Sequence, residues 1–427
     1  MAHPLSYFRK IHLEFVLLSL CFLSFCQSFA QNNNEVKYTF KPLQFSVFPG
    51  LSTNGINPGQ YKNGISINIL SGYSAGNTAF EVAGLSNFNK YSSYGIQLAG
   101  FINTIGGDIR LHKKYSKQES EQLKAGFTGI QTAGLFNVLT GDIEGIQITA
   151  GANLLGGSAT GFQLAGLANL NKEYFTGFQI AGIINFTGSF TSGVHLSGIM
   201  NYSSGELYGI QIAPFNRAST IYGIKSQVDI GYGLQMGLIN SAKDMDGYQI
   251  GLINKAKNVK GLQIGLINIY RKNKEGIPIA LINYGNGSES LNLWISETFL
   301  VNIGLGTGSE KVRNTISFSY SPFVNPNWPR RAFGYAISRI WHVNNGKQFK
   351  SIEMAFSWLN YEKVIKENAF NLLITPRYVY GVHIGRGIYF NIGGGVNYFI
   401  YPIENQKNIG VFKSPVWPSI IFGFHTD

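Results

Sequence analysis

One short phrase recurs along most of this chain and limits what the chain can fold into. The pattern G-apolar-Q-apolar-A-G-apolar-x-N repeats every sixteen residues, and its copies open at Gly129, Gly145, Gly161, Gly177, Gly193 and Gly209. Earlier copies begin at Ala79 and Gly95, and later copies, fourteen residues long, begin at Gly233, Gly247 and Gly261. Such periodicity means that one structural unit is stacked or paired many times, so the repeat decides the fold class.

Side chains alternate between two kinds within each copy. In the copy that opens at Gly161, Phe162 and Leu164 share one face with other apolar residues, whereas Gln163 and Asn169 lie on the other face. Alternation with a period of two indicates a β-strand with two different faces. Short runs of Gly, Ser, Thr, Asn and charged residues separate the copies and are typical of turns. The sequence therefore predicts an all-β protein.

The low charge of the predicted strands favours a membrane protein. Charged residues make up 13% of the chain, whereas about a quarter is usual in soluble domains. A strand of about thirteen residues, tilted by about 40°, spans roughly 30 Å, which suits the apolar band of an outer-membrane barrel. We therefore expect the repeats to form part of an antiparallel outer-membrane β-barrel, built partly from strand repeats of 14 to 16 residues.

Strand-like segments continue after the repeats, from Leu291 onwards. Aromatic residues cluster at their ends, as in the interfacial girdles of membrane barrels. The last segment carries Phe422 and Phe424, similar to the aromatic terminal strand of bacterial outer-membrane proteins, although residues 425–427 depart from that pattern. We expect these strands to belong to the same barrel as the repeats.

A β-solenoid is the alternative fold for the repeats. In a solenoid each copy forms one coil, the coils stack in parallel, and the fixed Gln and Asn residues form ladders. The shorter copies lack one residue before the central glycine, and in a continuous strand this loss would turn every later side chain to the other face. Pro214 also replaces a central glycine, although proline is poorly tolerated within a paired strand. A corner at this glycine explains both features, and so does a β-bulge. The alternative is therefore a solenoid followed by a C-terminal β-domain.

The first thirty residues have the pattern of a secretory signal peptide. Arg9 and Lys10 precede an apolar run over 15–26, and Ser28 and Ala30 occupy the small-residue positions of a cleavage site. No later run of eighteen apolar residues exists, so we expect no membrane-spanning helix.

Four regions follow from this pattern. They are a signal peptide over 1–30, an N-terminal segment over 31–63, a Gly-rich β repeat region over 64–288 and C-terminal antiparallel strands over 289–427. Both cysteines, Cys21 and Cys26, lie in the signal, so the exported chain has no disulfide and no thiolate metal site. The formal net charge is +12, but the basic residues are dispersed and the chain is exported, so we expect no nucleic-acid partner.

The tandem phrase "GLQIGLIN", followed after the repeats by "ISETFLVNIGLGTG", resembles the uncharacterised surface-repeat outer-membrane proteins of Bacteroidota and spirochaetes, which carry tandem GxQxGLxN repeats. The resemblance covers most of the chain after the signal. It implies export to the outer membrane or the cell surface, with outer-membrane lipid as a partner, and it transfers no catalytic residue.

The recurrent amides are the candidate functional residues. They are Gln97, Gln131, Gln147, Gln163, Gln179, Gln211, Gln235, Gln249 and Gln263, with Asn169 and Asn185. In a barrel these residues would line the lumen or rim and suit polar small solutes or glycans, whereas in a solenoid they would stack as a structural ladder. His195 replaces the repeat glutamine, and we expect it to be a polar residue of the lumen or surface.

No catalytic or metal-binding motif accompanies these amides. The seven histidines form no HxH or HExxH pair, and no nucleophile elbow can be recognised. We therefore expect no enzymatic activity, no cofactor and no metal. The predicted function is that of a non-enzymatic outer-membrane barrel, either a pore or a surface-structural protein; the alternative is a surface-exposed solenoid that serves as a repeat or adhesion module.

Overall fold

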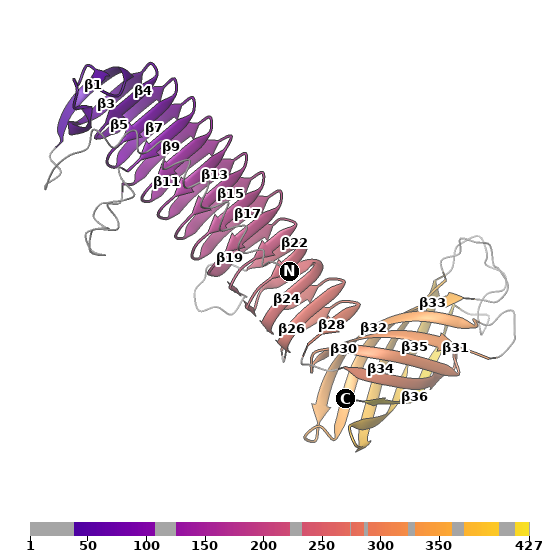
Figure 1. Ribbon diagram of the computed structural model, residues 1–427. Coiled ribbons are helices and arrows are strands. Elements are labelled where there is room, and N and C mark those ends of the chain that lie inside the picture. Colours follow the sequence, from indigo (N-terminus) through magenta and orange to yellow (C-terminus); the bar gives the residue numbers. More distant parts are fainter. Residues whose placement is uncertain are drawn as a thin grey trace, which may run out of the picture. The chain divides into compact units, whose positions relative to one another are not determined.

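The computed structural model describes residues 38–106, 125–222, 233–273, 275–285, 289–322, 329–360, 371–400 and 415–426. The predicted signal peptide lies outside these residues. The described residues form β-strands and one short 3-10 helix, η2 (Pro58–Gln60), which confirms the all-β prediction (Figure 1). No helix among them is long and apolar enough to cross a membrane. The chain divides into two compact units, Met1–Ile199 and Met200–Asp427.

Each repeat of the first unit forms one coil with two strands joined by a two-residue corner. The longer strand carries the G-apolar-Q segment, and the shorter strand carries the asparagine. The longer strands are β5 (Gly76–Ala83), β7 (Ser93–Ala99), β9 (Phe127–Ala133), β11 (Ile143–Thr149), β13 (Ala159–Ala165), β15 (Phe175–Ala181) and β17 (Thr191–Ser197). The shorter strands are β6 (Ser86–Asn89), β8 (Ile102–Ile105), β10 (Phe136–Leu139), β12 (Ala152–Leu155), β14 (Ala168–Asn171) and β16 (Ile184–Thr187). The stack begins with β1 (Thr39–Phe48), β2 (Leu51–Ser52), β3 (Tyr61–Asn68) and β4 (Ser71–Ser74).

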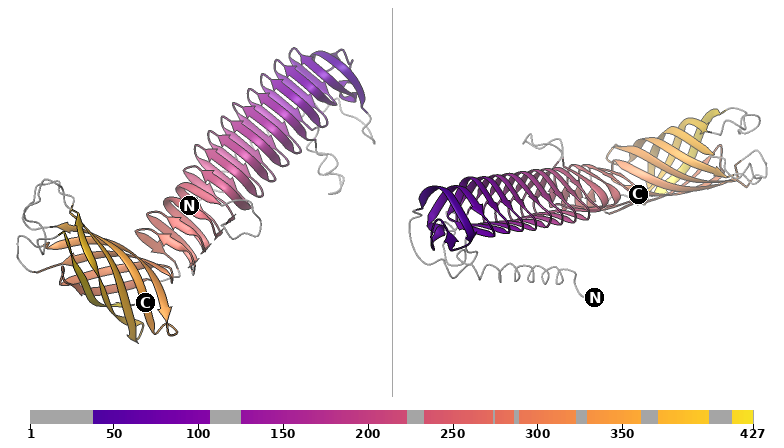
Figure 2. Two further views of the ribbon diagram at one scale, coloured as in Figure 1. Left: turned by 180° about the vertical axis from the view of Figure 1, so that it is seen from behind. Right: turned by 90° about the horizontal axis from the view of Figure 1, so that it is seen from above.

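Successive coils pair in parallel and in register. Strand β13 lies between β11 and β15, which places Gln163 between Gln147 and Gln179. The shorter strand β14 pairs in the same way with β12 and β16. Figure 2 shows the first unit from behind, where strands are stacked as they are in the front view. In-register parallel stacking of successive repeats is the pairing of a β-solenoid.

This pairing corrects the expectation that the repeats are antiparallel strands of a barrel. The alternative, a β-solenoid followed by a C-terminal β-domain, is the arrangement observed. The polar runs between copies join a shorter strand to the next parallel longer strand, so they are turns between coils and not hairpins.

Two glycines in each copy are required by the close stacking. At Gly177 the backbone φ is +127°, and a Cβ atom would lie 2.0 Å from the carbonyl oxygen of Gly161 in the preceding coil. At the corner, a Cβ on Gly182 would lie 2.1 Å from the carbonyl oxygen of Gly166. A side chain at either position would collide with backbone, and the first position also disfavours L-residues conformationally.

The coil has two distinct edges. We call the corner between the longer and shorter strands, such as Gly166 and Leu167, the apolar edge. We call the turn that leads to the next coil, such as 172–174, the polar edge. Inside the coil, the Gln and Asn side chains occupy the middle, and an apolar cluster that includes Phe127, Ile143 and Phe175 fills the space next to the polar edge.

Coils of the same kind open the second unit. Their strands are β18 (Met200–Ser203), β19 (Glu206–Ile212), β20 (Phe215–Arg217), β21 (Thr220–Ile221), β22 (Leu234–Ser241), β23 (Asp244–Met245), β24 (Tyr248–Val259), β25 (Leu262–Ile264), β26 (Ile267–Asn273), β27 (Ile277–Ile279) and β28 (Ile282–Tyr284). Strand β24 pairs in parallel with β22 and with β26.

The corner absorbs the difference between long and short copies. Asn169 follows Gln163 by six positions, whereas Asn254 follows Gln249 by only five, and all four side chains are buried. The residue lost is the inward alanine of the corner, Ala165 in the longer copy, so no side chain changes face. Pro214 also falls at a corner, between β19 and β20.

The C-terminal strands close an antiparallel barrel by themselves. The barrel consists of β29 (Ser290–Ser296), β30 (Val301–Gly308), β31 (Val312–Tyr320), β32 (Arg331–Val343), β33 (Gln348–Asn360), β34 (Leu372–Gly385), β35 (Ile388–Ile400) and β36 (Val416–Thr426). Strand β29 pairs with both β30 and β36, which completes the ring. The predicted antiparallel barrel is therefore confirmed, but the repeats are not part of it.

The connections at the two ends of the barrel differ in length. Residues 309–311, 344–347 and 386–387 connect strands at one end, which we call the short-turn end. Residues 321–330, 361–371 and 401–415, together with 297–300, connect strands at the other end, which we call the long-connection end. The barrel has eight strands, an even number, so its first and last strands have their free ends at the same end of the barrel. Strand β29 starts at the short-turn end, and β36 ends there.

Candidate functional site

The recurrent glutamines lie inside the coils and form hydrogen-bonded ladders. In the first unit, Nε2 of Gln147 donates to Oε1 of Gln131 at 2.8 Å, and Nε2 of Gln163 donates to Oε1 of Gln147 at 2.7 Å. Gln179 continues this ladder at 2.8 Å, and Gln131 donates in the same way to Gln97 at 2.7 Å. In the second unit, a corresponding ladder joins Gln211, Gln235, Gln249 and Gln263, with distances of 2.8 to 2.9 Å.

The asparagines form a second ladder that runs the other way along the stack. Nδ2 of Asn153 donates to Oδ1 of Asn169 at 2.8 Å, and Nδ2 of Asn169 donates to Oδ1 of Asn185 at 2.9 Å. The same Nδ2 of Asn169 also donates to the carbonyl oxygen of Ile180 at 2.8 Å. One asparagine thus binds both the side chain and the backbone of the next coil, which explains why an amide on a short side chain recurs at this position.

These ladders are closed to solvent. All nine glutamines are exposed by 1% or less, and Asn169 and Asn185 have no exposed surface. A solute therefore cannot contact these side chains in this structure, and the surface suited to solutes or glycans that a barrel lumen would have provided is not formed. A buried amide that makes its hydrogen bonds contributes about 1 kcal/mol for each bond, whereas an unpaired one costs about 1 to 3 kcal/mol. The repeated amides hold the coils in register.

Two ionisable residues interrupt the glutamine ladder. Glu81 replaces a glutamine and accepts hydrogen bonds from Asn89 and Gln97 at 2.7 and 2.8 Å, and burial raises the pKa of its carboxyl. His195 pairs in register with Gln179 but is fully buried, which corrects the expectation that it faces a lumen or the surface. Burial lowers the pKa of His195 to about 3, and Oε1 of Gln179 has no hydrogen-bond partner.

We expect the substitution His195→Gln to stabilise the coils, and to do so more strongly at lower pH. The new amide can donate to Oε1 of Gln179, a gain of about 1 kcal/mol at pH 7.5. The unfolded histidine binds a proton below pH about 6.5, whereas the folded one stays neutral down to about 3, so the wild type loses stability as the pH falls. At pH 5 this loss is about 2 kcal/mol, and the variant avoids it. Thermal unfolding followed by circular dichroism at both pH values measures the gain; an equal gain at both would contradict the role of burial, and His342→Gln is the exposed control.

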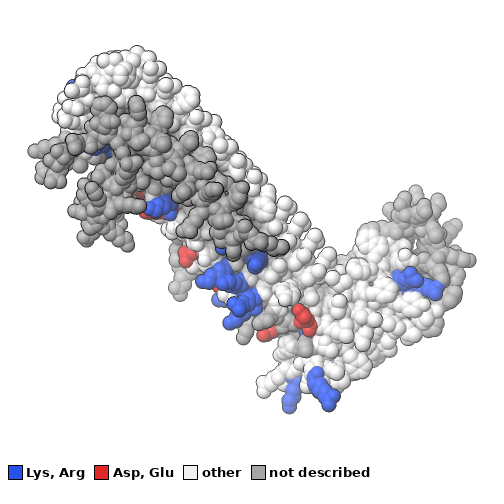
Figure 3. Space-filling view, viewed as in Figure 1, with Lys and Arg blue, Asp and Glu red and all other residues white. Residues whose placement is uncertain are grey.

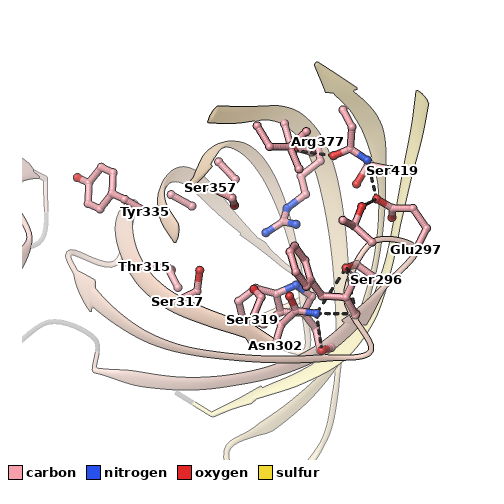
Figure 4. Close-up of a pocket in the computed structure, with 18 residues that line it drawn as sticks. Ser296, Glu297, Asn302, Thr315, Ser317, Ser319, Tyr335, Ser357, Arg377 and Ser419 are labelled. Atoms are coloured by element: carbon pink, nitrogen blue, oxygen red, sulfur yellow. Dashed lines mark hydrogen bonds between the residues drawn. The ribbon is translucent and has the colours of Figure 1, made fainter. Parts of the chain in front are cut away.

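The barrel interior contains a second group of polar residues. Arg377 forms an ion pair with Glu353 and lies 5.8 Å from the ring centroid of Trp294. Near the long-connection end, Nδ2 of Asn302 donates to the carbonyl oxygens of Trp294 and Phe299, both at 3.0 Å. Figure 4 shows Arg377 and the small hydroxyl residues pointing into the barrel, whereas Tyr335 points away from it. Arg377 and Glu353 pair with each other, and the carboxylate of Glu297 in the same pocket accepts hydrogen bonds from Nδ2 of Asn397 and from the backbone N–H of Ile420, so these three charges are engaged by the barrel's own residues.

Packed side chains also close the barrel at both ends. At the long-connection end, an apolar cluster contains Phe299, Phe399 and Trp417. At the short-turn end, the rings of Phe349, Tyr389 and His425 lie within 4.8 to 5.6 Å of one another. The cavity between the two ends measures about 40 Å³, enough for only a few water molecules.

The chain has no match among protein-family models, curated proteins or solved structures. The described residues contain no group of three or more His, Cys, Asp or Glu side chains that could hold a metal ion.

The junction between the last coil and the barrel is a feature that the sequence did not reveal. A solenoid ends in an open edge of unpaired backbone groups, which other proteins cover or charge. Here barrel side chains pair with that edge. Nδ2 of Asn314 donates to the carbonyl oxygen of Pro278 at 2.6 Å, and Oγ of Ser309 donates to that of Gly276 at 3.1 Å. The backbone N–H of Asn283 donates to Oγ1 of Thr307 at 3.2 Å.

This contact explains the polar residues on the outside of the barrel. Asn314 and Thr307 occupy outward positions in strands whose other outward residues, such as Leu305 and Phe318, are apolar and exposed. The last coil covers Asn314, which is only 1% exposed. The sequence carries one sign of this junction. The segment 276–283, "GIPIALIN", resembles a further copy of the repeat, but Pro278 replaces the ladder glutamine and ends the ladder.

Proposed function

We propose that this chain is a non-enzymatic outer-membrane protein in which the barrel is a membrane anchor and the solenoid is the structural module that it holds. The observation that carries the proposal is the alternation in the barrel strands. In β36, Ile420, Phe422 and Phe424 point outward and are 42% to 49% exposed, whereas Trp417 and Ser419 are buried inside. An apolar band around a polar interior suits lipid, whereas in water this apolar band would remain exposed to solvent.

The packed interior favours an anchor over a pore. Eight-stranded barrels have an interior just wide enough for side chains to fill it, and here the ion pair of Arg377 and Glu353 and the two end clusters occupy it. A conducting channel would need these groups to leave the lumen.

Topology favours a solenoid on the periplasmic side of the membrane. Outer-membrane barrels have short periplasmic turns and longer extracellular loops. The coils precede β29, which starts at the short-turn end. The alternative function, a surface-exposed adhesion module, would place the coils on the side of the long connections, so the connection lengths argue against it.

Cysteine labelling in intact cells tests this proposal, since the only native cysteines lie in the predicted signal. Asn360→Cys marks the long-connection end and Lys347→Cys marks the short-turn end. We expect the chain in the outer-membrane fraction, with an impermeant maleimide labelling Asn360→Cys in intact cells and Lys347→Cys only after permeabilisation. We also expect no conductance steps in planar bilayers.

Recovery of the wild-type chain in the soluble periplasmic fraction would overturn the membrane anchor. Labelling of Lys347→Cys in intact cells would show that the short-turn end faces the outside of the cell. Regular conductance steps would show that the barrel is a pore.

A further inference from the structure

The outer surface of the coils is apolar on three sides. On the longer strand, Ile146, Ile148 and Phe178 point outward and are 36% to 57% exposed. At the apolar edge, most coils present one large apolar residue that is 40% to 50% exposed: Leu85, Phe101, Leu135, Leu167, Ile183 and Ile199 in the first unit, and Leu238, Leu252, Leu266 and Leu281 in the second. Two coils have Gly151 and Pro214 at this position instead. On the shorter strand, Phe215, Ile239 and Ile282 are 37% to 49% exposed.

Such a surface is far too large for a protein that faces water. Contiguous apolar patches of soluble monomers rarely exceed a few hundred Å², whereas these rows follow both strand faces and the edge between them in coil after coil. Large apolar residues thus cover the outside of the coils, whereas the amide ladders and a separate apolar cluster lie inside.

The described charges of the coils gather on the remaining side, at and near the polar edge. Figure 3 shows blue and red side chains along one edge of the stacked strands and white surface along the opposite edge, with further charged side chains on the barrel. In the coils of the second unit the described basic residues are Arg217, Lys243, Lys255, Lys257, Lys260, Arg271 and Lys272, and the acidic ones are Glu206, Asp244, Asp246 and Glu275. Basic residues therefore outnumber acidic ones there.

Polarity changes in steps from the polar edge to the apolar edge. The outward row of the longer strands nearest the polar edge consists of Tyr94, Thr128, Glu144, Thr160, Thr176 and Ser192. The rows after it are apolar up to the edge, for example from Phe162 to Leu167. From Phe162 to the end of the strand at Ala165, three residue steps cover roughly 10 Å at about 3.3 Å per residue. The corner residues add to this depth, which stays within one leaflet of a hydrocarbon core of about 30 Å.

The corners of the coils also meet the requirement of a lipid environment, where every N–H and C=O needs an internal partner. Corner groups are paired between coils: the N–H of Gly166 donates to the carbonyl oxygen of Thr149 at 3.0 Å, and that of Leu167 to Gly151 at 2.9 Å. Barrel side chains pair with the open edge of the last coil, as described above.

We infer that the solenoid inserts its apolar edge and flanking faces into one leaflet of a lipid bilayer, with the polar edge at the headgroups. The inference rests on the proposed membrane location of the barrel. Lipid fits better than a second protein because the apolar surface extends around three sides and stops at one depth, whereas a protein interface covers a single patch. The basic excess suits anionic headgroups. The contact of the last coil next to the turn 309–311 places that coil at the short-turn end of the barrel, so the leaflet is the one on that side.

Fluorescence quenching of the full chain in vesicles of phosphatidylethanolamine and phosphatidylglycerol tests this inference. A single cysteine that carries an environment-sensitive fluorophore replaces Leu167 or Leu252 at the apolar edge, Lys172 or Lys257 near the polar edge of the same coils, and Ile420 on the barrel wall. We expect lipids with a nitroxide on the acyl chain to quench the Leu167, Leu252 and Ile420 labels at least twofold. We expect aqueous iodide to quench the Lys172 and Lys257 labels instead.

The Ile420 label separates failure of this inference from failure of the proposed function. Quenching of Ile420 by lipid, together with quenching of Leu167 and Leu252 by iodide, would overturn insertion of the solenoid and leave the anchor intact. Leu167 and Leu252 labels that neither quencher reaches would show a protein cover, such as a second copy, and would also overturn the inference. Quenching of Ile420 by iodide alone would overturn the anchor itself.

Discussion

The substitution Phe422→Arg is expected to lower the stability of the barrel in membranes by about 2 to 4 kcal/mol, the cost of arginine near the midplane of an outer-membrane barrel. Phe422 lies in the middle of β36, points outward and is 42% exposed. Its neighbours inside the barrel, Trp417 and Ile421, are untouched by the change because they point to the other face. Urea unfolding of the barrel in lipid vesicles, followed by tryptophan fluorescence, measures the loss.

Val416→Arg is the matched control because it lies on the same strand and the same face, near the long-connection end. We expect a loss of at most about 1 kcal/mol there, since the cost of arginine falls towards the interface. Equal losses at the two positions, or no loss at Phe422, would show that this wall does not face the middle of a bilayer.

A second large effect is expected from Gly177→Ala within the solenoid. The new Cβ would lie 2.0 Å from the carbonyl oxygen of Gly161, and the backbone φ of +127° is unfavourable for alanine. The strain alone costs about 1 to 3 kcal/mol, and the collision forces neighbouring coils apart and stretches the ladder between Gln163 and Gln179. We expect a total loss of roughly 3 kcal/mol or more.

Hydrogen-deuterium exchange of peptides from 159–199 measures this loss locally. Thr176→Ala, on the outward side of the same strand, is the control and should change exchange little. Protection that stays at the wild-type level in Gly177→Ala would mean that the coils do not stack as closely as the structure indicates.

Alternation along the repeat predicted which side chains share a face. Phe162 and Leu164 point outward and Gln163 and Asn169 inward, as their period of two indicates. The antiparallel barrel of the C-terminal strands was also predictable, because those strands follow the same rule without a repeat. The sequence could not decide how neighbouring copies pair, since a two-faced strand with a polar turn suits either an antiparallel hairpin or a coil.

The preference for a single large barrel failed for a definite reason. Low charge and outward apolar residues are also typical of membrane-spanning strands, and the alternation alone does not reveal that the strand ends at the corner at Gly166. The two details that spoke against this, the missing alanine of the shorter copies and Pro214, both fall at corners. The capping contacts of Asn314 and Ser309 join residues more than thirty positions apart, so no local pattern identifies the barrel residues that cap the last coil, although Pro278 marks the end of the ladder.

The way in which the barrel closes the last coil makes the length of the solenoid adjustable. Asn314, Ser309 and Thr307 contact the final coil through its backbone and do not depend on how many coils precede it. A duplication or deletion of one whole copy would lengthen or shorten the stack by about 4.8 Å and leave both the ladders and the junction intact. Tandem repeats in DNA gain and lose units by slippage, so the length of this solenoid can change in discrete steps without any change in the barrel.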